Sequence, residues 1–125
     1  MIRGSVNAYR VATVDLEVQG PAGDRNRIEF VVDTGYDGLL SLHSAFAAEL
    51  KLQKFATGRG VLADGTETSY DTCEGFVVWN GELRPVIIDV LDSVALLGMG
   101  LLEGHELRLE AVLDGSVHIT PLDVA

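Results

Sequence analysis

Apolar and polar residues alternate along several short segments of the chain, as is typical of strands that bury one face. Val14, Leu16 and Val18 are separated by polar residues, and a similar alternation runs over residues 27–32. We expect a strand at each place. Residues 20–26 are rich in glycine and polar side chains, so they are expected to form the loop between the two strands.

Two dipeptides, Asp64-Gly65 and Asn80-Gly81, stand between further strand-like stretches. Such pairs tolerate a positive φ at both central positions of a tight turn, so they predict hairpins over residues 59–72 and 75–90. Pro85 has no amide proton to donate, and we expect it at a sheet edge or a bulge.

The remaining segments are short. Residues 39–42 and 95–97 are apolar and predict buried strands, and Ser44 is a favourable cap for a brief helix over residues 45–50. A helical turn at 101–103 and two further strands, at 107–111 and 116–120, complete the pattern. The whole predicts an all-β protein of eight to ten short strands with one or two small helices.

Composition changes this picture little. The chain has 125 residues, 47% of them hydrophobic and 22% charged, which fits one globular domain over residues 1–125. The formal net charge is −10, with 19 acidic against 9 basic residues, which argues against nucleic acid or an anionic membrane surface as partner.

Cysteine content and hydropathy suggest where the protein works. Cys73 is the only cysteine, so an intrachain disulfide and a cysteine-rich zinc site are excluded, and a reducing compartment fits. The longest apolar stretch, residues 94–102, contains two glycines and is too short to span a bilayer. Because the first residues also lack the apolar core of a signal peptide, we expect a cytoplasmic protein.

The motif with the most chemical content is Asp33-Thr34-Gly35, where an apolar strand delivers a carboxylate into a glycine loop. Taken alone, this tripeptide is more typical of a turn in which the aspartate accepts hydrogen bonds from nearby amides. Three segments, the first of which contains the tripeptide, give it a context. They are FVVDTG at 30–35, LADGTE at 62–67 and ALLGMGLL at 95–102.

In their order and spacing these segments resemble the retropepsin-like aspartic proteases, and most of all the small bacterial single-domain members. Trp79-Asn80-Gly81 fits the same pattern. The resemblance implies a closed acid-protease barrel with one DTG loop per chain. It also implies a homodimeric endopeptidase that needs no cofactor and acts on peptides or unfolded proteins.

The resemblance assigns roles to individual residues. Asp33 of each chain would be the catalytic acid or base, because two adjacent carboxylates share one proton and can divide the two tasks. Thr34 would hydrogen-bond across the pair, and Gly35 would let the substrate approach. A hairpin would form a flap over the substrate, and its residues are Leu62, Ala63, Asp64, Gly65 and Thr66.

Two positions depart from the family pattern. Tyr36 replaces a small residue beside the catalytic loop, where it would narrow the substrate cleft or hydrogen-bond near the aspartates. Asp37 lacks its usual arginine partner, since Met99 stands at that place. We expect Asp37 to pair with Arg10 or Arg108, or to face water.

Other chemistries find little support. His43, His105 and His118 are scattered, and the stretch HELRL at 105–109 lacks the second histidine of a zinc-protease helix, so no metal site is expected. Acidic neighbours should raise the pKa of the Cys73 thiol and keep it unreactive. Two alternatives remain open: a non-catalytic protease-like dimer that binds peptides or protein partners, and an unrelated β-barrel that binds a small ligand.

Overall fold

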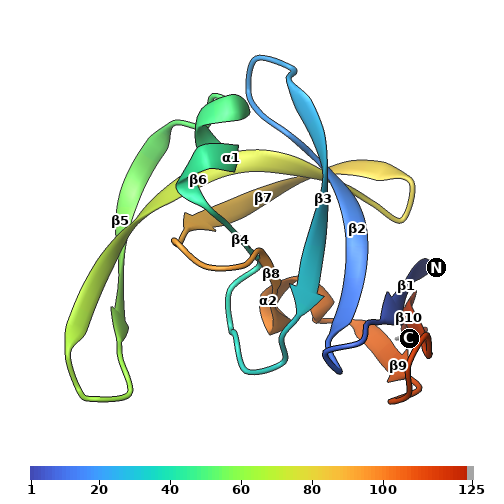
Figure 1. The fold of residues 1–125 in the computed structure, drawn as a ribbon. Coiled ribbons are helices and arrows are strands. Elements are labelled where there is room, and N and C mark those ends of the chain that lie inside the picture. The colour runs from blue at the N-terminus through green and yellow to red at the C-terminus, as the bar shows by residue number, and fades with distance from the viewer. Residues whose placement is uncertain (124–125) are drawn as a thin grey trace.

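The computed structural model describes residues 1–123 and contains, within them, ten strands and two short helices (Figure 1). The all-β prediction is confirmed. No helix among these residues is long and apolar enough to cross a membrane. The elements are β1 Ile2–Val6, β2 Ala12–Gln19, β3 Arg25–Val32, β4 Leu40–Leu42, α1 Ser44–Glu49, β5 Lys54–Val61, β6 Glu67–Trp79, β7 Glu82–Val90, β8 Leu96–Leu97, α2 Met99–Leu102, β9 His105–Leu109 and β10 Ser116–Pro121.

The strands form one sheet in the order β5-β6-β7-β4-β8-β3-β2-β1-β10-β9. An additional pairing of β6 with β2, through Val18 opposite Val77, closes the six strands from β6 to β2 into a ring. Figure 1 shows β6 as the long strand that crosses from the β5 hairpin to β2. Two pairings inside the ring are parallel: β3 pairs with β8, and β4 pairs with β7. These pairings bring the ends of the four strands together.

Alternation along the strands builds the core inside this ring. Val14, Leu16 and Val18 of β2 are buried as predicted, and Phe30 of β3 is fully enclosed. A buried aliphatic or aromatic side chain contributes roughly 1.5–3 kcal/mol, so this core outweighs any single polar contact. Its other members include Leu40, Leu42, Leu50, Val77, Ile88, Leu97, Leu101, Val117 and Ile119.

Several predicted boundaries are wrong, and two of the differences have a clear local cause. Strand β3 begins at Arg25, because its pairing with β2 extends to Gln19 and the Arg25 guanidinium donates to the Gln19 side chain at 2.7 Å. The cap of α1 is His43, whose Nδ1 accepts the Ala45 amide at 3.1 Å. Ser44 is the first residue of the helix instead.

The predicted turns divide into one that is correct and one that differs. Asn80 and Gly81 both have positive φ, at 52° and 80°, as the hairpin requires. At the other hairpin only Gly65 does, at 86°, because residues 63–65 form a three-residue loop closed by the Leu62 amide donating to Thr66 at 2.8 Å. Pro85 lies in the part of β7 that pairs with β6 before β4 joins it, which confirms an edge position.

Candidate active site

The segment from Asp33 to Gly38 leaves the end of β3 and is held there by β8. The Asp33 amide donates to the Leu97 carbonyl at 2.9 Å, and the Val31 amide donates to the Ala95 carbonyl at 2.8 Å. Because β8 runs parallel to β3, these bonds fix the end of the strand and the first residue of the loop. The start of the loop is therefore set by the core of the protein.

The Asp33 side chain forms the local turn that the tripeptide alone would predict. Its Oδ1 accepts the Gly35 amide at 2.8 Å, which occupies one oxygen of the carboxylate. The side chain is half-buried, while Thr34 and Gly35 are exposed. A Cβ on Gly35 would lie 3.2 Å from Asp33 Oδ1, which is tighter than an ordinary contact. A side chain at position 35 would therefore crowd the carboxylate.

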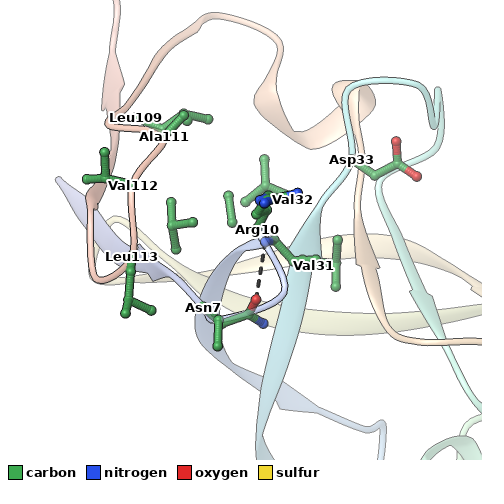
Figure 2. A pocket seen from close by; sticks show the side chains of 13 residues that line it. Asn7, Arg10, Val31, Val32, Asp33, Leu109, Ala111, Val112 and Leu113 are labelled. Carbon is green, nitrogen blue, oxygen red and sulfur yellow. Dashed lines mark hydrogen bonds between the residues drawn. The ribbon is translucent and has the colours of Figure 1, made fainter.

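Asp33 stands at the rim of a cavity of about 650 Å³. The cavity lies between the β1–β2 turn, the end of β3 and the loop after β9, and its lining is mostly aliphatic. Figure 2 shows Val112 and Leu113 on one side, Arg10 in the middle and Asp33 on the other side. Its shape and lining suit an apolar side chain of a ligand.

Sequence reasoning missed the loop after β9 as part of this site. The signal was present as the run Ala111-Val112-Leu113, which is exposed although it is apolar. Exposed apolar residues that adjoin one another are more often an interaction surface than isolated ones are.

The residue after Gly35 points away from Asp33. The Tyr36 hydroxyl donates a short hydrogen bond to the Asp89 carboxylate on β7 and lies 3.3 Å from the Leu40 carbonyl. Burial, and then the bond to Asp89, raise the pKa of Tyr36 far above its ordinary value. The hydrogen bond of the Tyr36 hydroxyl is thus made to Asp89 and not to Asp33, and the two roles expected for Tyr36 beside the catalytic loop stay predictions.

Asp37 is exposed to water. None of the ion pairs within residues 1–123 includes it, and Arg108 pairs with Glu106 at 3.6 Å. The expectation that Asp37 faces water is the correct one of the alternatives.

Helix α2 packs directly on the loop that runs from Asp33 to Gly38. The Met99 amide donates to the Tyr36 carbonyl at 2.8 Å, and the Gly100 amide donates to the Gly38 carbonyl at 3.0 Å. A Cβ on Gly98 would lie 2.2 Å from the Gly38 carbonyl oxygen, so only glycine permits this approach. The apolar-apolar-glycine segment at 95–102 therefore holds the DTG loop in place through backbone contacts.

The predicted flap is the β5–β6 hairpin, which projects from the body of the protein in Figure 1. Residues 62–66 are all exposed, and Leu62 exposes 53% of its surface. The Asp64 side chain accepts the Thr66 amide at 2.9 Å. Hydrogen bonding with the Thr66 side chain, and then with this amide, lowers the pKa of the carboxyl group. The tip is thus ordered by its own hydrogen bonds and has no burial to hold it against the body.

The remaining candidates have structural roles. His105 accepts the Trp79 indole N–H at 3.1 Å and lies edge-on to its ring, and His43 caps α1. Among residues 1–123 there is no group of three side chains that could hold a metal ion. Cys73 is buried, and burial followed by the charge of Asp71 raises its pKa, which confirms the predicted direction.

These features define an all-β, retropepsin-like fold in which β3, β8 and α2 hold one DTG loop. The fold is shared with a retropepsin-like aspartic protease from Rickettsia conorii, with a TM-score of 0.61 and 20% identity over 96% of this chain and 89% of that one. It is also shared with the EIAV protease, solved with the inhibitor HBY-793, with a TM-score of 0.55 and 20% identity over 73% and 84% of the two chains.

No family model and no curated protein matches the sequence. The fold is nevertheless retropepsin-like and not that of a different β-barrel.

Proposed function

We propose that the protein is an aspartic endopeptidase that works as a homodimer, with Asp33 of each chain meeting at a two-fold axis. The observation that carries this proposal is the Asp33-Thr34-Gly35 loop, held by β8 and α2 at the rim of an apolar cavity in a retropepsin-like fold. One chain supplies one such carboxylate, and the chemistry needs two, so the second must come from another copy.

The proposed reaction divides acid and base work between the two carboxylates. Two carboxyl groups a few ångströms apart hold one proton between them, because both cannot stay ionised. The ionised Asp33 takes a proton from water as the water oxygen bonds to the peptide carbon, and the protonated one donates to the carbonyl oxygen. The C–N bond then breaks as the leaving nitrogen takes up the proton held by the pair, and one hydroxyl of the diol intermediate returns its proton to the pair, which leaves a carboxylic acid and an amine.

Neighbouring residues support this chemistry in distinct ways. The Thr34 hydroxyl is exposed, which leaves it available to a partner loop across the two-fold axis. Gly35 keeps space open above the carboxylate. The flap residues 62–66 would close over the bound peptide and exclude water, a task that suits a weakly anchored hairpin. Tyr36 and Asp37 would border the same cleft. The reaction uses no cofactor, and a cytoplasmic location fits the single reduced cysteine.

The test is turnover of a peptide library by the purified protein and by its Asp33→Asn variant. The asparagine Oδ1 still accepts the Gly35 amide, so we expect the fold and the dimer to persist while hydrolysis disappears. Asp15→Asn, the same change at an exposed residue of β2, is the matched control and should keep full turnover.

Two outcomes would contradict the proposal. Sedimentation should give about twice the chain mass of 13.4 kDa, and a monomer that still cleaves peptide would refute a shared site. A dimer that binds peptides without hydrolysing them would favour the second candidate, a protease-like binding protein.

A further inference from the structure

A carboxylate outside the DTG loop is tied to it through one side chain. Asp89 stands near the end of β7 and accepts the hydroxyl proton of Tyr36, the residue that directly follows Gly35. Asp89 is half-buried, and none of the ion pairs within residues 1–123 neutralises it. A partly desolvated carboxylate without a cation binds a hydroxyl donor more strongly than an exposed one does.

The Tyr36 ring is enclosed on two sides by glycines. A Cβ on Gly38 would lie 2.3 Å from the Tyr36 hydroxyl oxygen, and a Cβ on Gly98 would lie 2.6 Å from ring atom Cδ2. The Tyr36 amide donates to the Asp33 carbonyl at 3.2 Å. The hydrogen bond that fixes the Tyr36 hydroxyl therefore also fixes the position of the ring. The ring in turn fixes the backbone of the loop on both sides of Tyr36.

The same carboxylate faces the base of the β5–β6 hairpin. Asp89 lies opposite Thr72 of β6, so Tyr70, two residues along that strand, is its diagonal neighbour on the same face. The Tyr70 ring lies against Gly58 of β5, where a Cβ would be 2.2 Å from it. Burial and then the charge of Asp89 raise the pKa of Tyr70, as expected for a phenol beside this carboxylate.

We propose that Asp89 is a positioning residue: through Tyr36 it sets the conformation of the loop that carries Asp33, and beside Tyr70 it joins that loop to the base of the hairpin. Its effect on catalysis rests on the proposed function. Its effect on the loop does not, and the two are measured separately.

The experiment compares Asp89→Leu, which removes the acceptor at similar volume, with Asp89→Asn, which keeps an acceptor oxygen, and with Tyr36→Phe, which removes the donor. Hydrogen–deuterium exchange is followed at the amides of residues 34–38 and at Phe30 in the core. We expect Asp89→Leu and Tyr36→Phe to speed exchange in the loop and leave Phe30 unchanged. Asp89→Asn should restore most of the protection.

Peptide turnover is measured on the same variants. A displaced catalytic group slows chemistry more than it weakens binding, so kcat should fall by roughly tenfold to a hundredfold while KM changes by less than about twofold. The double variant with Tyr36→Phe and Asp89→Leu should be no worse than Asp89→Leu alone, because Asp89→Leu already breaks the bond that Tyr36→Phe removes. Glu82→Leu, at the other end of β7, is the control and should change neither readout.

The outcomes separate the two proposals. A wild-type protein without turnover refutes the proposed function, and loop exchange then decides the role of Asp89 alone. Loop exchange that is unchanged in Asp89→Leu or Tyr36→Phe refutes the positioning role. Should Asp89→Leu fail to fold, Tyr36→Phe breaks the same bond with a smaller change and is judged by the same measurements.

Discussion

Replacing Gly98 by alanine should destabilise the protein through steric contacts with the loop that carries Asp33. Gly98 is buried, and its φ of −103° is open to any residue, so the substitution brings no backbone strain. The added Cβ would meet the Gly38 carbonyl oxygen at 2.2 Å and the Tyr36 carbonyl oxygen at 2.7 Å. Both obstacles are backbone atoms, which cannot rotate away as a flexible side chain can.

The size of the effect follows from what must move. An ordinary contact needs about 3.5 Å, so the loop and α2 must separate by about 1 Å. That movement stretches three backbone hydrogen bonds, in which the amides of Gly98, Met99 and Gly100 donate to the loop at 2.8–3.0 Å. At about 1 kcal/mol each, their loss amounts to roughly 3 kcal/mol. This is a large share of a typical total stability of about 5–15 kcal/mol.

Urea unfolding of the wild type, Gly98→Ala and Gly60→Ala would test this. A Cβ on Gly60 meets only Thr68 and Tyr70 side-chain atoms at 3.7 and 3.8 Å, so the same substitution there should be neutral or slightly stabilising. Amide exchange should also rise at Met99 and Gly100 in the Gly98 variant. Equal unfolding midpoints for the two variants would refute the claim that the close backbone approach at Gly98 holds the loop in place.

Three further predictions concern other parts of the molecule. Amide exchange over residues 62–67 should be fast in the free protein and slow with a bound peptide-like inhibitor, and equal protection in both states would indicate a rigid turn. The folded state keeps Tyr36 protonated above its ordinary pKa of 10.0 while the unfolded state releases the proton, so stability should fall as the pH rises beyond 10. Tyr36→Phe should flatten that decline, and parallel curves would contradict the assignment. His105→Phe should leave the buried Trp79 indole N–H without its acceptor and cost about 1–3 kcal/mol in urea unfolding, whereas a loss below about 0.5 kcal/mol would point to a replacement partner.

The sequence predicts well those elements whose signal lies in neighbouring residues. Strand β2 and the turn at Asn80-Gly81 follow from two-residue alternation and from a dipeptide with one dominant geometry. Strand β1 was not predicted, because Gly4 in its centre hides the alternation of Ile2 and Val6. The glycine is required there, since a Cβ would lie 1.9 Å from the Thr13 carbonyl oxygen.

The residues of the candidate site likewise divide into those with a local signal in the sequence and those without one. Asp33 and its loop are recognisable because the strand and the glycine are contiguous. Asp89 is not, because the 53 positions that separate it from Tyr36 are bridged only by the pairing of β4 with β7. The sequence does not point to His43 as a helix cap because the serine beside it satisfies the usual rule, while the His43 ring nitrogen accepts a different first-turn amide, that of Ala45.

The projecting β5–β6 hairpin also has a consequence for how the chain can be divided. Beyond Thr72 both faces of this two-stranded ribbon meet water, and such ribbons are marginally stable without support. A cut between Asp64 and Gly65 would leave β2, β3 and β4 on one fragment and β6, β7 and β8 on the other, three strands of the closed ring each. Exposed loop tips tolerate such breaks. We therefore expect that the two halves, produced as separate polypeptides, recover the fold only on meeting each other.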